Sequence, residues 1–138
     1  MPRKPLLIFL LTLFLTVLQV QWAAPADGYA DEALSVLSPE VLGAYPGVLL
    51  LFLLAVFARR AMPVMRQAAI CTALLAVYWL LANYVTFDAR VASWSTYSSL
   101  EIWAHVLPAS VVSVAACGAA FFCASWLILR ETRWNKSG

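Results

Sequence analysis

One uncharged stretch, from Val106 to Leu129, constrains this chain more than any other feature. It reads VLPASVVSVAACGAAFFCASWLIL and is long enough to cross a bilayer as a single α-helix. Small side chains recur along it at spacings of three and four residues, which places them on one stripe of a helix. The stripe comprises Ala109, Ser113, Ala116, Ala120 and Ala124. Small residues let helix backbones approach closely in a membrane, so we expect another helix to pack against this stripe.

Composition and charge extend this reading to the whole chain. Of 138 residues, 64% are hydrophobic and 12% are charged, which predicts an integral membrane protein with one domain, residues 1–138. All but one of the nine Lys and Arg residues fall in three clusters, and all but one of the seven acids lie between them. Basic loops stay in the cytoplasm, so both termini are expected inside. The clusters are short membrane flanks, which argues against nucleic-acid binding.

These patterns predict an all-α, integral membrane four-helix bundle with short loops. The expected spans cover residues 5–24, 39–58, 68–87 and 106–129, and short interfacial segments cover 31–37 and 99–105. The inner basic anchors are expected to be Arg59, Arg60, Arg66, Arg130 and Arg133. The clean charge pattern places such a protein in a bacterial inner membrane as a multi-pass protein.

The first span carries a polar face and allows a second interpretation. Thr12, Thr16 and Gln19 lie at spacings of four and three, which turns them toward a partner helix. The rival is a cleaved signal peptide, because a basic start and an apolar core precede the small-x-small sequence at residues 24–26. Cleavage there would leave a three-helix protein.

The third and fourth spans carry further packing signals. Asn83 lies about one turn inside the outer end of the third span, and an amide at that depth is expected to bond across helices. Small residues on the same side of this span are expected to pack on the stripe of the fourth, as an antiparallel neighbour. Ser98 and Glu101 match a capping box, which predicts that the last helix starts at Ser99.

Groups able to perform chemistry are scarce. The single histidine, His105, follows Glu101 by four residues, so both project from one helical face near the outer surface, where Asp88 is also expected. Cys71, Cys117 and Cys123 all fall within predicted spans and form no Cys-x-x-Cys or metal-ligand spacing. We therefore expect no catalytic residues, no metal and no cofactor.

The residues favour a non-enzymatic accessory, assembly or stabilising subunit of a larger inner-membrane complex. Its partners would be the lipid bilayer and another membrane protein subunit. Two alternatives remain open at this point. One is a small homo-oligomeric transporter or channel lined by the polar residues of the spans. The other is a membrane enzyme, binding protein or immunity protein with an outer-surface site near Glu101 and His105.

Overall fold

Three long helices make up the described part of the chain. The computed structural model describes residues 3–23, 62–91 and 97–134, and its helices are α1 (Arg3–Ala23), α3 (Val64–Val91) and α4 (Ser99–Trp134). No strand occurs among these residues, and each helix is long and apolar enough to cross a membrane. The prediction of an all-α chain is thereby confirmed for the described residues, which form three helices long and apolar enough to span a membrane. The expected span 39–58, the segment 31–37 and the anchors Arg59 and Arg60 lie outside the described residues.

Local chemistry explains where two of the helices begin. Pro63 precedes α3, and its carbonyl accepts a hydrogen bond from the Gln67 N–H at 3.1 Å, which closes the first turn. At the start of α4, Oε2 of Glu101 accepts bonds from the N–H and the hydroxyl of Ser98, both at 2.8 Å. The Glu101 N–H donates back to the Ser98 hydroxyl at 3.5 Å, which completes a capping box. α4 therefore starts at Ser99, as predicted.

α4 is longer than a membrane crossing requires. The expected interfacial segment 99–105 and span 106–129 both belong to one helix of 36 residues, which continues through Pro108 and ends at Trp134. At 1.5 Å per residue such a helix is about 54 Å long, against about 30 Å for the hydrocarbon core of a bilayer. The uncharged stretch 106–129 begins after the first turn of α4, so we expect Glu101 to lie outside the membrane-spanning part.

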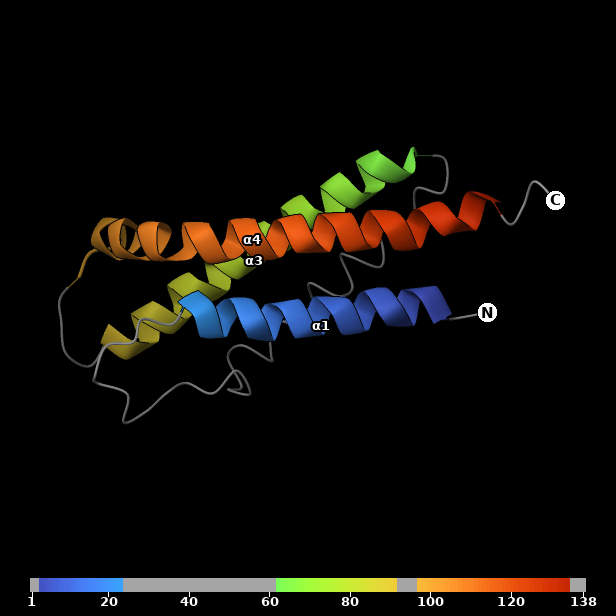
Figure 1. Ribbon diagram of the computed structural model, residues 1–138. Coiled ribbons are helices and arrows are strands. Elements are labelled where there is room, and N and C mark those ends of the chain that lie inside the picture. The colour runs from blue at the N-terminus through green and yellow to red at the C-terminus, as the bar shows by residue number, and fades with distance from the viewer. Residues whose placement is uncertain (1–2, 24–61, 92–96, 135–138) are drawn as a thin grey trace.

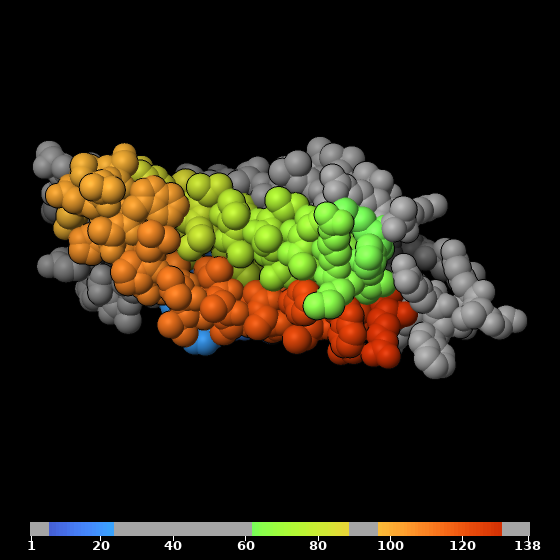
Figure 2. All heavy atoms as spheres, turned by 90° about the horizontal axis from the view of Figure 1, so that it is seen from above, coloured from blue at the N-terminus to red at the C-terminus, as the bar shows by residue number. Residues whose placement is uncertain are grey.

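The three helices are packed around α4. α1 and α3 run in the same direction and α4 runs in the opposite one (Figure 1). α4 contacts both of the others, and its interface with α3 is the largest of the three. Seen from above, α3 and α4 lie side by side along one face, with most of α1 hidden behind them (Figure 2). The antiparallel pairing of α3 with α4 is the one expected from the sequence.

An apolar core lies where the three helices meet. Trp79 of α3 and Phe121 of α4 are fully buried in it, and α1 contributes Ile8 and Leu15. Many large apolar side chains of the same helices are exposed instead, Phe14 and Met65 among them. A bundle in water would bury such residues, whereas lipid accepts them without cost, so this surface suits a membrane.

Candidate functional site

Polar side chains gather inside the bundle, and their surroundings are apolar. We call this group the polar seam. It consists of Thr12, Thr16 and Gln19 from α1, Trp79 and Asn83 from α3, and Ser110 and Ser113 from α4. All seven are buried, so they face neither water nor lipid. Polar groups in such a place need hydrogen-bond partners within the protein.

The first part of the seam joins α1 to α3. The indole N–H of Trp79 donates to Oγ1 of Thr16 at 3.0 Å. The Thr16 hydroxyl donates in turn to the Thr12 carbonyl at 2.8 Å, and the Thr12 hydroxyl donates to the Ile8 carbonyl at 2.7 Å. Because both threonine protons go to their own helix, Thr16 offers Trp79 an acceptor that is already oriented.

The second part joins α4 to the other two helices. Nδ2 of Asn83 donates to Oγ of Ser110 at 2.9 Å, which is the kind of cross-helix bond expected of an amide at this depth. Nε2 of Gln19 donates to Oγ of Ser113 at 3.3 Å, and the Ser113 hydroxyl donates to the Ser110 carbonyl at 3.0 Å. Every pair of described helices is therefore tied by at least one side-chain hydrogen bond.

The alanine stripe of α4 lies beside its packing face. Ala109, Ala116 and Ala120 are exposed, Ala124 is partly buried, and only Ser113 of the five predicted stripe residues is buried. The helix instead turns a neighbouring stripe toward α1 and α3, formed by Val106, Ser110, Ser113, Cys117 and Phe121. The prediction that α3 packs on the alanines of α4 is therefore wrong. α3 meets the neighbouring side of α4, where serine hydroxyls and a phenylalanine fill the interface. We call Ala109, Ala116 and Ala120 the alanine face.

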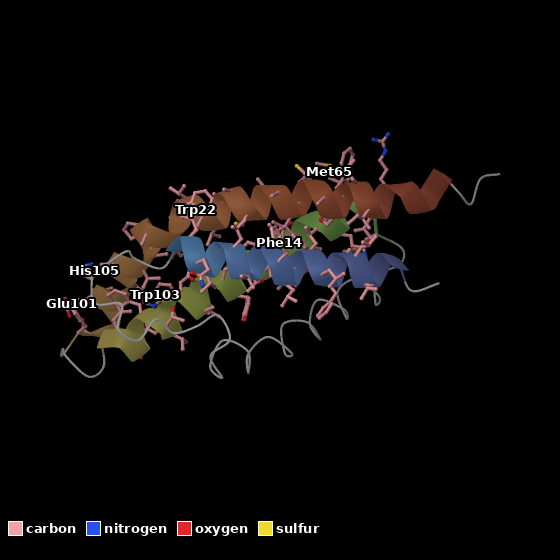
Figure 3. The ribbon with its side chains drawn as sticks, turned by 60° about the horizontal axis from the view of Figure 1, so that its bottom comes forward. Phe14, Trp22, Met65, Glu101, Trp103 and His105 are labelled. Atoms are coloured by element: carbon pink, nitrogen blue, oxygen red, sulfur yellow. The ribbon has the colours of Figure 1, made fainter. Side chains whose placement is uncertain are left out.

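Aromatic rings surround the histidine at one end of the bundle. The ring of His105 stacks on Phe87 with centroids 5.9 Å apart, and the ring of Tyr97 meets it edge-on at 5.7 Å. Close by, Tyr84 and Trp103 pack with centroids 4.7 Å apart. Figure 3 shows Glu101, His105 and Trp103 together at this end, with Met65 toward the other. Aromatic rings of this kind are typical of a membrane–water interface.

Glu101 and Asp88 are the described acidic residues at this end of the bundle. Glu101 is committed to capping α4, and the bonds from the backbone and hydroxyl of Ser98 lower the pKa of its carboxyl, with a smaller contribution from His105. Asp88 is exposed near the end of α3. Among the described residues, no three His, Cys, Asp or Glu side chains lie close enough together to hold a metal ion.

The described basic side chains lie at the opposite end. Arg66 follows the start of α3 and Arg130 lies near the end of α4, and the directions of the helices place both at the same end of the bundle (Figure 1). The guanidinium of Arg130 sits 5.2 Å from the ring centroid of Trp126, a cation–π contact. Arg133 belongs to the last turn of α4. Cys71 and Cys117 are buried free thiols, and Cys123 is an exposed free thiol.

Comparison with protein-family models, curated proteins and solved structures finds no match for this chain. The class of this protein is therefore defined by the architecture of its described helices. They form a bundle of membrane-type helices joined by the buried polar seam.

Two members of the seam were not singled out in the sequence. Ser110 precedes Ser113 by three residues and so shares its helical face, which is a signal that periodicity could have given. Trp79 lies in the middle of an apolar run, and a tryptophan there resembles any other core residue until its N–H is seen to reach Thr16.

Proposed function

We propose that this protein is an accessory, assembly or stabilising subunit of a larger complex in a bacterial inner membrane. The observation that carries the proposal is the exposed alanine face of α4. Lipid gains nothing from small side chains, whereas a neighbouring helix gains close backbone contact. α4 thus offers two packing faces, one occupied by α1 and α3 and one available to another helix.

The burial of the seam favours this role over a channel. A pore between copies of the chain would need polar side chains that face its water-filled lumen. Thr12, Thr16, Gln19, Asn83 and Ser113 are instead buried and engaged in hydrogen bonds within one chain. A surface enzyme or binding site is disfavoured in the same way, because the Glu101 carboxylate already serves Ser98.

The same proposal includes four crossings with both termini inside. α1 and α3 run in the same direction (Figure 1), so the residues between them must connect the far end of α1 with the near end of α3. A return of this kind across a bilayer fits the apolar stretch at 39–58. The positions of Arg66 and Arg130 at one end, opposite Asp88 and Glu101, support a cytoplasmic location for that end.

α1 stays attached in this proposal. A cleaved signal peptide has no reason to bond to the mature protein, whereas Thr16 accepts the Trp79 N–H and Gln19 donates to Ser113. Removal of α1 would take away the described acceptor of that indole N–H. The intact mass of the protein from its own host tests this directly, because cleavage near residue 24 would remove the mass of α1.

The experiment for the main proposal adds bulk to the alanine face. The tagged chain is purified from its own host in gentle detergent as wild type, as Ala116→Leu with Ala120→Leu, and as the control Ala73→Leu on α3, which is also an exposed alanine. We expect a stoichiometric membrane partner with the wild type and the control, and its loss with the double variant, while all three remain folded.

Two outcomes would contradict the proposal. If the wild type carries no partner, the subunit role is wrong. If the double variant unfolds, the alanine face is covered within the chain itself, and the partner would have to bind elsewhere.

A further inference from the structure

The end of the bundle that carries Arg66 and Arg130, which we call the basic end, holds one of its cations against an aromatic ring. The guanidinium of Arg130 lies 5.2 Å from the ring centroid of Trp126, which precedes it by one turn of α4. A cation–π contact of this kind leaves N–H donors of the guanidinium available to other partners. Because Arg130 is exposed, those donors are open to the surroundings of the protein.

The described carboxylates do not neutralise this cation. Asp88 near the end of α3 and Glu101 at the start of α4 both lie at the opposite end of the bundle (Figure 1). Glu131 is the next residue along α4, and neighbours in sequence do not face each other on a helix. Arg130 thus presents a full positive charge and a planar set of N–H donors, which is the arrangement that binds a phosphate group in a bidentate manner.

The place of Arg130 along α4 indicates the source of such a phosphate. Arg130 is the first charged residue after the uncharged stretch 106–129, so it lies where the hydrocarbon of a bilayer gives way to the headgroups. Leu127, its neighbour three residues earlier on the helix surface, is 54% exposed. An exposed apolar side chain beside the cation suits the acyl chain of a lipid, whereas a free anion in water would gain nothing from it.

We propose that Arg130 and Trp126 form a binding site for the headgroup phosphate of an anionic phospholipid. The Arg130 guanidinium donates to the phosphate oxygens, and the acyl chain lies along Leu127. Trp126 orders the guanidinium before the lipid arrives, so that less side-chain entropy is lost on binding. This site goes beyond the subunit role and does not depend on it.

Arg66 provides a matched control, because it brings the same charge to a similar depth on another helix. α3 and α4 touch at Thr72 and Gly118, where a Cβ added to the glycine would lie 3.7 Å from Cγ2 of the threonine. From this contact to Arg66 is about 9 Å along α3, and to Trp126 about 12 Å along α4 in the same direction, at 1.5 Å per residue. Arg66 is also exposed, so its replacement changes the charge of the basic end without disturbing the core.

The test measures lipid binding to the full-length protein in gentle detergent by native mass spectrometry. The protein is titrated with phosphatidylglycerol, and the first bound lipid gives a dissociation constant. Arg130→Gln should weaken binding about tenfold or more, because hydrogen bonds from a charged donor are lost. Trp126→Leu keeps every charge and should weaken it about two- to tenfold, because the guanidinium must then be ordered on binding.

Two further variants separate this site from general attraction between a basic surface and an anionic lipid. Arg130→Lys keeps the charge and loses the planar donors, so we expect several-fold weaker binding. Arg66→Gln removes one charge and should weaken binding clearly less than Arg130→Gln does. General attraction instead predicts equal losses for Arg66→Gln and Arg130→Gln, with no effect of Arg130→Lys or Trp126→Leu.

Either of those last two patterns would overturn the proposal. Binding of phosphatidylcholine as tight as that of phosphatidylglycerol would overturn it too, and so would displacement of the lipid by inorganic phosphate, which would assign the site to a free anion. Circular dichroism checks that each variant is folded. If Trp126→Leu fails to fold, Arg130→Lys decides, because that side chain is exposed and lies outside the core.

Discussion

Disruption of the bond between Trp79 and Thr16 tests whether the seam holds α1 to α3. Thr16→Val keeps the shape of the side chain and removes the only described acceptor of the Trp79 N–H. Because Trp79 is 0% exposed, that N–H would be left buried without a partner, at a cost of about 1–3 kcal/mol. Trp79→Phe removes the donor together with part of the ring.

A double-mutant cycle isolates the bond from these other losses. Thr16→Val also removes the bond from the Thr16 hydroxyl to the Thr12 carbonyl, and Trp79→Phe also removes packing in the core. Each of these losses occurs in both backgrounds of the cycle and therefore cancels. What remains is the coupling of the two side chains. Hydrogen bonds between membrane helices average about 0.6 kcal/mol and reach about 1.7 kcal/mol, so we expect a coupling in that range.

The assay is equilibrium unfolding by a denaturing detergent in mixed micelles, followed by circular dichroism. Thr86→Val serves as the matched control, because the Thr86 hydroxyl donates only to carbonyls of its own helix, Ala82 and Asn83. Its effect should add to that of Trp79→Phe within about 0.3–0.5 kcal/mol. A coupling between Thr16 and Trp79 that falls inside this additivity error would refute the idea that the seam bonds stabilise the bundle.

Three further predictions concern α4. Phe121→Ala, at a fully buried core position, should lower the free energy of unfolding by about 3–5 kcal/mol in the same assay. Gly118→Ala should raise the free energy of unfolding by about 0.5–1 kcal/mol, because alanine is the better helix former. The added Cβ would lie 3.7 Å from Cγ2 of Thr72, which is an ordinary contact. A destabilised variant would mean that α3 and α4 lie closer together than described. The lowered pKa of Glu101 means that its carboxylate stabilises the first turn of α4 above the ordinary value of 4.5, and that this contribution is lost as the pH falls through the lowered pKa. Amide hydrogen exchange in that turn should accelerate, beyond the intrinsic pH dependence, as the medium is acidified, and Glu101→Gln should remove this change.

Much of the helical architecture could be predicted because it depends on local sequence. Long uncharged runs predicted the three helices, and the capping box predicted the first residue of α4. α3 and α4 run several residues beyond the expected spans, since hydropathy measures the apolar part of a helix and backbone bonding continues past it. Residue spacing also placed Thr12, Thr16 and Gln19 on one face.

The sequence could not predict equally well which side of α4 packs against α1 and α3. Small residues indicate a surface that a helix can approach, but they do not say which helix approaches it. The alanine stripe and the stripe through Ser110, Cys117 and Phe121 have the same helical period, so the sequence offers two adjacent faces. The choice between them comes from hydrogen bonds to Gln19 and Asn83, which depend on how three helices meet.

The most direct test of the subunit role is the native mass of the tagged wild-type chain released in gentle detergent from the membrane of its own host. A mass equal to this chain plus a second membrane protein in fixed ratio is the result that the proposal predicts, and mass fingerprinting of that component would name the process. A mass equal to one copy or a whole number of copies of this chain alone would contradict the proposal.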